Sequence, residues 1–280
     1  MVTMLTLQPE WSMSYDVSRM KYEYKYMVRN SMRDELRRLI APFMEFDPYM
    51  ELRRIGGAGE QMLGYTVRSI YYDTEDLRFY REKDDGIADR KKVRIRGYNE
   101  FGRNNIVFLE LKHKHEKKIF KNRASVLYGD LDRLLESGDA ESYVLKFGSR
   151  QEPLADAERF LFALRRDRLV PVVLVIYERE AYFGKFDNSF RITFDKNLRS
   201  SLTPSTGDLY EERGIRPHAE GWFVLEVKFY QTFPSWMTDV IRILDLKQQS
   251  FSKYTGCIDS HFTGRSVPRS LPVIHRTPLR

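Results

Sequence analysis

The sequence contains a single cysteine, Cys257, and no long run of apolar residues. One cysteine cannot form an intrachain disulfide, and such usage is typical of a reducing compartment. A membrane-spanning helix needs about 18 or more consecutive apolar residues, which no segment provides. The N-terminus has neither a basic start nor a long apolar stretch, so no signal peptide is predicted. We therefore expect a soluble, cytoplasmic protein.

Motifs of several common catalytic sites are also missing. Gly56, Gly57 and Gly59 form a glycine cluster, but no Gly-Lys-Ser or Gly-Lys-Thr follows it, so it does not predict a phosphate-binding loop. The five histidines do not recur at a metal-ligand spacing, and His113 and His115 are interpreted as non-ligands. A histidine-based metal centre is therefore not expected.

Basic residues are plentiful. The net charge is +7 at pH 7 and the isoelectric point is near 9.3, which favours anionic partners such as nucleotide, polyphosphate, nucleic acid or anionic lipid. The 280 residues, of which 42% are hydrophobic, suffice for the core of one large or two small domains.

The clearest local pattern is an alternation of charged and aliphatic residues. In residues 107–114, V-F-L-E-L-K-H-K, Glu110 and Lys112 alternate with Leu109 and Leu111. Successive side chains leave a strand on opposite faces, so this period of two predicts a strand with one charged face. The L-E-V-K-F segment at 225–229 repeats the pattern.

Similar segments occur along most of the chain. Strands are predicted at 20–29, 65–73, 90–97, 107–114, 118–126, 171–180, 188–195 and 222–230. Helices are predicted after a cap at Asn30 or Ser31, after a cap at Asp73 or Thr74, within 128–169, and from Pro234. Residues 47–64 and 199–220 are predicted to be loops. The fold class expected is mainly antiparallel β (α+β).

The charged strand faces are mostly cationic. They carry Lys21, Glu23, Lys25, Lys92, Arg94, Arg96, Glu110, Lys112, Lys114, Lys121, Arg123, Arg179, Arg191, Glu226 and Lys228. If the eight strands close into a barrel, alternate residues point into its lumen. Burying unpaired charge costs several kcal/mol, so such a lumen needs anions. If the sheet closes in this way, the sequence predicts a charged lumen, helices outside it and a polyanionic ligand within it.

The chemistry expected of such a lumen concerns phosphate. Arginine offers a planar fork for phosphate oxygens, and lysine offers a point charge. Glu226 and Glu110 are oxygen donors suited to Mg²⁺ or Mn²⁺. For Glu110 two interpretations stay open: a structural ion pair with lumen cations, or a metal or catalytic role.

Eight segments, in order, resemble the catalytic domain of the vacuolar transporter chaperone (VTC) family, the polyphosphate polymerase branch of the triphosphate tunnel metalloenzymes. They are K-Y-E-Y-K-Y, S-I-Y-Y-D, V-R-I-R, E-L-K-H-K, Y-E-R-E, R-I-T-F-D, L-E-V-K and S-F-S-K-Y, spread from about Lys21 to Asp259. The resemblance implies an eight-stranded closed antiparallel tunnel and metal-dependent transfer of the γ-phosphate of ATP onto a growing polyphosphate chain. We expect the catalytic domain at 21–262, between a lead-in at 1–20 that lacks periodicity and a flexible, proline-containing tail at 263–280.

The resemblance also implies roles for individual residues. Those expected to act in catalysis are Lys112, Arg96, Arg94 and Lys228. Those expected to bind substrate are Lys25, Arg81, Lys121, Arg123, Tyr177, Arg179, Arg191, Ser252 and Lys253, of which Lys121 and Arg123 resemble residues that guide the polymer and Arg81 is a weaker match. Glu226 matches the metal ligand of the family.

Two positions depart from the family pattern. The wider superfamily often begins with E-x-E-x-K, where this chain has Lys21 in place of the first glutamate. The polymerases tend to carry lysine at the position of Ser250. Eukaryotic relatives also have membrane segments and a phosphate-sensing domain, which this sequence lacks, so coupled translocation would need a separate membrane partner.

Three functions remain open from the sequence. The first is an ATP-dependent polyphosphate polymerase that uses Mn²⁺ or Mg²⁺. The second is a metal-dependent hydrolase of tripolyphosphate or nucleoside triphosphate, and the third is a non-catalytic polyphosphate-binding module. Nucleic-acid binding is not expected, because a barrel would hide alternating basic residues from a duplex.

Overall fold

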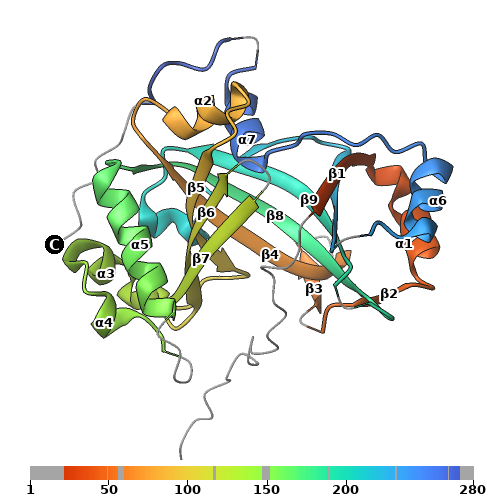
Figure 1. Ribbon diagram of the computed structural model, residues 1–280, viewed down its shortest axis with the longest axis horizontal. Coiled ribbons are helices and arrows are strands. Elements are labelled where there is room, and N and C mark those ends of the chain that lie inside the picture. The colour runs from red at the N-terminus through yellow and green to blue at the C-terminus, as the bar shows by residue number, and fades with distance from the viewer. Residues whose placement is uncertain are drawn as a thin grey trace, which may run out of the picture.

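The chain forms one large antiparallel sheet with helices on its faces (Figure 1). The computed structural model describes residues 22–48, 50–55, 60–115, 118–146, 152–187, 189–230, 232–263 and 265–271. The lead-in predicted at 1–20 and the Gly56–Gly59 cluster lie outside these residues.

The strands are β1 (Tyr22–Arg29), β2 (Met44–Phe46), β3 (Glu51–Ile55), β4 (Glu60–Asp73), β5 (Arg90–Tyr98), β6 (Ile106–His115), β7 (Lys118–Leu127), β8 (Val170–Gly184), β9 (Arg191–Leu202), β10 (Arg216–Pro217) and β11 (Trp222–Phe229). The helices are α1 (Arg33–Ile40), α2 (Arg78–Asp84), α3 (Leu131–Ser137), α4 (Ala140–Tyr143), α5 (Glu152–Arg166), α6 (Ser235–Ile243) and α7 (Lys253–His261). Among the described residues, no helix is both long and apolar enough to cross a membrane.

The main path of the sheet runs in the order β1-β11-β9-β8-β4-β5-β6-β7, and every pairing along it is antiparallel. Three short strands pair at its sides, β2 with β8, β3 with β4 and β10 with β9. The predicted antiparallel fold with eight principal strands is therefore confirmed.

The predicted hydrogen-bonded closure of the barrel is not found. No ladder joins β1 to β7 in the described part of the chain, so the path has two free ends. Each end instead meets a short segment from elsewhere: Gln248 bridges to Tyr26 on β1, and Val144 bridges to Val126 on β7. These segments occupy the edges that direct pairing of the two strands would need.

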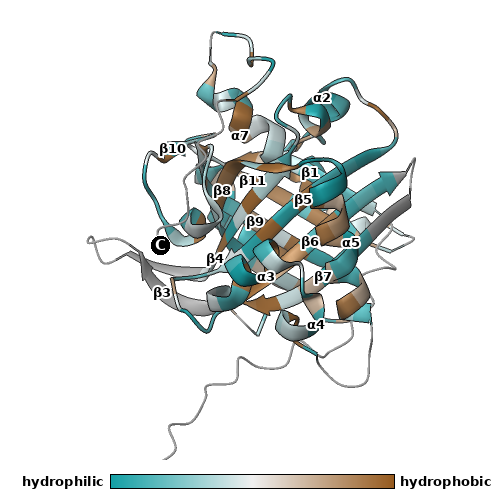
Figure 2. Ribbon diagram, turned by 90° about the vertical axis from the view of Figure 1, so that its left-hand side faces the viewer, coloured by the Kyte–Doolittle hydropathy of each residue, from teal (hydrophilic) through white to brown (hydrophobic). Residues whose placement is uncertain are grey.

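The outer face of the sheet carries most of the core. On β4 to β6, residues such as Ile70, Ile95 and Leu109 pack against Leu134 of α3 and Phe160 of α5. Figure 2 shows the resulting alternation of apolar and polar residues along these strands, with α3, α4 and α5 beside them. Because the apolar residues alternate, the charged residues between them must face the other way.

A second cluster covers the outer face at the β1 edge. Val28 and Leu225 pack there against Leu36 of α1 and Met237 of α6. Figure 1 shows α1 and α6 together at this end of the molecule, opposite α3, α4 and α5. The sequence predicted this arrangement, in which apolar side chains of these strands face outward and charged side chains face inward.

A third cluster lies on the inner, concave face, where α7 packs. Tyr254 and Cys257 of α7 contact the group that contains Val67, Val175 and Leu198. The helix therefore fills one part of the concave face with apolar side chains. The remaining part is charged.

Asp73 anchors both α2 and α7. Its carboxylate accepts hydrogen bonds from the amides of Phe79 and Tyr80 at 2.9 Å and from the hydroxyl of Tyr254. These hydrogen bonds to the amides of α2 confirm that the Asp73 carboxylate caps the helix, although Leu77, with φ of 58°, occupies the N-cap position itself.

Several local predictions were wrong. Part of the segment predicted as a loop, 47–64, forms β3 and the start of β4, which pair as a hairpin around the glycine cluster. The strand predicted at 188–195 begins later and extends to Leu202, because β8 gives it a long partner. The side chains of Asn30 and Ser31 do not cap α1; residues Asn30–Met32 form a 3-10 turn ahead of it. Helix α7 was not predicted.

Candidate functional site

Strand alternation gathers nearly all of the predicted site residues on the concave face. They are Lys25, Arg94, Arg96, Glu110, Lys112, Lys121, Arg123, Tyr177, Arg179, Arg191, Glu226, Lys228, Ser252 and Lys253. They come from β1, β5, β6, β7, β8, β9, β11 and the start of α7. Residues far apart in sequence therefore meet because the sheet curves around them.

Glu110 is the centre of one ion-pair cluster. In the ladder it lies opposite Arg94 on β5 and Arg123 on β7. Its Oε2 atom is 2.6 Å from Arg94 Nη2, and its Oε1 atom is 3.0 Å from Lys121 Nζ and 3.4 Å from Arg123 Nε. Arg96 approaches to 4.0 Å. Burial opposes ionisation of this carboxyl, but the four cations hold its pKa well below the usual range.

Glu226 is the centre of a second cluster. Its carboxylate lies 2.6 Å from Lys253 Nζ, 3.0 Å from Lys228 Nζ, and 3.5 Å and 3.6 Å from atoms of Arg179 and Lys25. The side chain is only about 6% exposed. Burial again opposes ionisation, and the surrounding cations lower the pKa well below its normal value.

Two carboxylates of the second cluster were not among the predicted site residues. Asp195 binds Arg179 through two hydrogen bonds of 2.6 and 2.7 Å, and Lys253 Nζ lies 2.5 Å away. Glu23 lies 3.0 Å from Lys25 and 3.9 Å from Lys228. Both lie in strand alternation with predicted residues, which is the signal that could have identified them.

Tyr177 and Ser252 lie beside these cations. The ring of Tyr177 is contacted by Arg179 and Lys253, with centroid distances of 5.2 and 5.0 Å. Its hydroxyl is 3.5 Å from Arg96, so it lies between the two clusters. Ser252 is the N-cap of α7. The position of each is consistent with the flanking role that the resemblance implies.

Arg191 and Arg81 differ in position. Arg191 pairs in the ladder with Lys228, shares its strand face with Asp195, and places its guanidinium 4.3 Å from the centroid of Phe183. Arg81 lies on α2, where it contacts Asp76 and donates to the carbonyl of Arg269. The structure therefore does not bring Arg81 together with the other predicted residues.

The family of the chain is shown by a match over most of its length. A family model for the VTC domain matches residues 20–262. The chain belongs to the VTC domain family. The resemblance found in the sequence is thereby confirmed.

Other comparisons with this VTC domain are distant. No curated protein matches it. A solved structure described as the putative adenylyl cyclase HpAC1 from Hippeastrum, with a dominant triphosphatase activity, matches 89% of this chain and 99% of its own. The identity is 10% and the TM-score is 0.41, values at which the likeness carries no argument about function.

Two carboxylates of the VTC domain, Glu226 and Asp195, are candidate ligands of a divalent cation. Within the described residues, no three or more His, Cys, Asp or Glu side chains form a metal-binding group. Mg²⁺, however, is usually held by one or two carboxylates together with substrate phosphates. Glu226 and Asp195 both contact Lys253 Nζ and are close enough together to provide such a pair. Glu110 also contacts four cations, but no second carboxylate among the described residues contacts the side chains of those cations, which favours the ion-pair interpretation for it.

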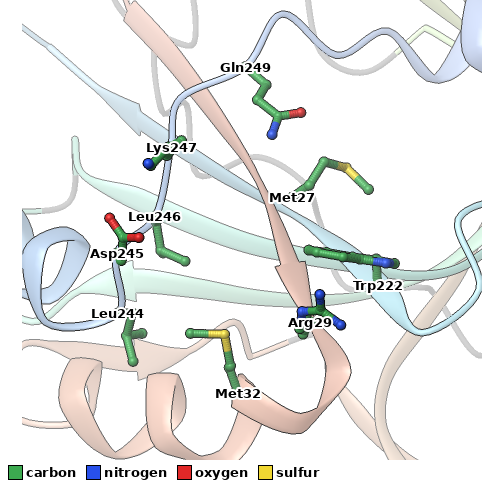
Figure 3. Close-up of a pocket in the computed structure, with 9 residues that line it drawn as sticks. All are labelled: Met27, Arg29, Met32, Trp222, Leu244, Asp245, Leu246, Lys247 and Gln249. Carbon is green, nitrogen blue, oxygen red and sulfur yellow. The ribbon is translucent and has the colours of Figure 1, made fainter.

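A pocket of about 250 Å³ lies outside these clusters (Figure 3). Its walls include Met27, Arg29 and Trp222 on one side and Lys247 and Gln249 on the other. The Arg29 guanidinium lies 4.6 Å from the centroid of the Trp222 ring. No predicted site residue lines this pocket, so the cationic concave face of the VTC domain is the better candidate.

Proposed function

We propose that this VTC domain is a polyphosphate polymerase that transfers the γ-phosphate of ATP onto a growing polyphosphate chain. One observation carries the proposal: basic side chains from seven strands and α7 converge on one concave face, where they outnumber the carboxylates. The carboxylates are Glu23, Glu110, Asp195 and Glu226. The excess positive charge suits a ligand with several linked negative groups.

Phosphoryl transfer suits this arrangement because it needs mainly positioning and neutralisation of charge. We assign contact with the reacting phosphates to Lys112, Arg94, Arg96 and Lys228. The remaining substrate contacts are assigned to Lys25, Lys121, Arg123, Tyr177, Arg179, Arg191, Ser252 and Lys253. The arginine forks already lie in fixed orientations, held by Glu110 and Asp195, so little reorganisation is needed on binding.

A bound Mg²⁺ or Mn²⁺ would neutralise phosphate charge and would be held by Glu226, with Asp195 beside it. Lys253 and Arg179 orient these two carboxylates. Glu110 is assigned to orienting Arg94 and neutralising Lys121 rather than to the ion.

Hydrolysis of tripolyphosphate or nucleoside triphosphate is the second candidate. Glu23 favours it, because this carboxylate lies 3.0 Å from Lys25 among the proposed phosphate-binding cations. A carboxylate there can accept a hydrogen bond from water and orient it for attack on phosphorus.

One experiment separates these functions. The purified protein is incubated with ATP and Mn²⁺ or Mg²⁺, and the products are resolved on a polyacrylamide gel, with a metal chelator as control. Polymer supports the polymerase. ADP and orthophosphate without polymer, together with release of orthophosphate from tripolyphosphate, would refute it in favour of the hydrolase. Binding of tripolyphosphate without any metal-dependent product would leave only a binding module.

A further inference from the structure

Two neighbouring rows of side chains cross β5, β6 and β7 on the concave face, and their charges differ. In the first row Arg94, Glu110 and Arg123 are paired across the ladder, so a carboxylate separates two cations. The second row contains only Lys92, Lys112 and Lys121. Like charges directly opposite each other on neighbouring strands are destabilising. The second row therefore costs stability unless an anion joins it.

The positive charges of the three lysines in the second row are not equally neutralised by carboxylates. Lys121 reaches back to Glu110 at 3.0 Å. Lys112 has no carboxylate within ion-pair distance among the described residues. Lys92 Nζ donates to the hydroxyl of Ser252 at 3.1 Å, a neutral partner. Within the described part of the chain, the ammonium groups of Lys92 and Lys112 thus have no ion pair.

The surroundings of Lys92 are cationic as well. Burial lowers its pKa well below the usual value, and Lys25, Lys112 and Arg94 lower it further, while Glu23 opposes the shift. Burial likewise lowers the pKa of Lys112, with Glu23 opposing and nearby cations contributing. Both groups would gain from an anion placed between them.

We propose that Lys92 is a phosphate ligand that forms, with Lys112 and the hydroxyl of Ser252, a subsite for one phosphate of a linked chain. The subsite adjoins the row of Glu110 and lies at the start of α7. The inference rests on the proposed function, in that it takes the ligand to be linked phosphate. The sequence pattern placed Lys92 on a charged strand face, but neither that pattern nor the family resemblance gave it a role in binding substrate.

Two roles are possible for Lys92, and they predict opposite changes in stability. If Lys92 only holds α7 through Ser252, its loss lowers the melting temperature of the free protein. If Lys92 is a phosphate ligand, its replacement removes an uncompensated cation, so the melting temperature of the free protein stays the same or rises. Only the second role makes the charge itself necessary for binding.

The test uses four variants of the full chain. Lys92→Met removes the charge, Lys92→Arg keeps it, and Ser252→Ala removes the neutral partner. Lys91→Met is the matched control, because Lys91 is the adjacent residue of β5 and faces the other side of the strand. Tripolyphosphate affinity is measured by titration calorimetry, and the melting temperature is measured without ligand.

We expect Lys92→Met to weaken tripolyphosphate binding by about tenfold or more, the loss typical of one charge-assisted hydrogen bond. Its melting temperature without ligand should not fall, Lys92→Arg should restore most of the affinity, and Lys91→Met should bind like the wild type. Unchanged affinity in Lys92→Met would overturn the inference. So would a lower melting temperature with lost binding that Lys92→Arg does not restore. Failure of the wild type to bind tripolyphosphate would instead overturn the proposed function.

Discussion

Replacing Glu110 by glutamine tests the charge balance of the concave face. The substitution keeps the size of the side chain but removes the only carboxylate among the described residues that lies within 4.0 Å of the side-chain nitrogens of Arg94, Arg96, Lys121 and Arg123. Glu110 is 2% exposed, so water cannot take over its role. Breaking a buried ion pair by removing one partner costs about 3–5 kcal/mol.

The expected effect on unfolding follows from that cost. For a domain of this size each kcal/mol lowers the melting temperature by about 2–4 °C, so Glu110→Gln should lower it by roughly 6–20 °C. Tripolyphosphate should recover part of the loss, because it supplies negative charge to the same cations. Glu100→Gln is the control, since the Glu100 side chain is 78% exposed and lies 4.0 Å from Arg68.

The same variant separates the two interpretations of Glu110. Scanning calorimetry is run with and without Mn²⁺. If Glu110 neutralises cations, Mn²⁺ stabilises Glu110→Gln as much as it stabilises the wild type, whereas Glu226→Gln loses that stabilisation. A fall below 1 °C in the melting temperature, or loss of the Mn²⁺ effect in Glu110→Gln alone, would refute the reasoning.

Three further predictions concern other parts of the protein. Lys112→Ala and Arg96→Ala should each remove most of the phosphate-transfer activity while circular dichroism shows an intact fold; normal turnover in either would count against the site. Cys257 is fully buried, and burial raises its pKa to about 12, so it should resist thiol reagents until the protein is unfolded; rapid labelling of the native protein would contradict the packing of α7. Glu180 is buried and bonded to Arg37, which helps to hold its pKa below normal against the effect of burial. Its contribution is present above about pH 4.5 and is lost as the pH falls, so Glu180→Gln should be less stable than the wild type in urea at pH 7 and nearly equal to it in strong acid. A difference that does not depend on pH would exclude this ion pair as its cause.

The faces of the strands could be predicted from the sequence, and their partners could not. The period of two in 107–114 places Glu110 and Lys112 on one face whatever the rest of the chain does. Ladder register is set by contacts between distant segments, so the sequence did not indicate that Glu110 would lie between Arg94 and Arg123. The contacts of Asp195 and Glu23 with the site cations likewise depend on ladder register, so these carboxylates were not identified from the sequence.

The remaining errors have similar causes. The segment that became β3 was predicted as a loop because a glycine cluster marks a turn but does not show whether strands flank it. Helix α7 has weak apolar periodicity, and its position is fixed by its contacts with Val175 and Leu198. Closure of the sheet could not be judged from strand patterns, since it depends on which segments pair with the two edge strands, β1 and β7.

The covered edges of the open sheet also bear on solubility at high concentration. An unpaired strand exposes amide and carbonyl groups that can recruit a strand from another molecule and begin aggregation. On β1 the amide of Gln249 donates to the carbonyl of Lys25, and on β7 the amide of Leu145 donates to the carbonyl of Ser125. The carboxylate of Asp156 accepts from the amide of Arg123 on the same edge. Segments from elsewhere in the chain thus occupy part of each margin, which hinders intermolecular strand addition there.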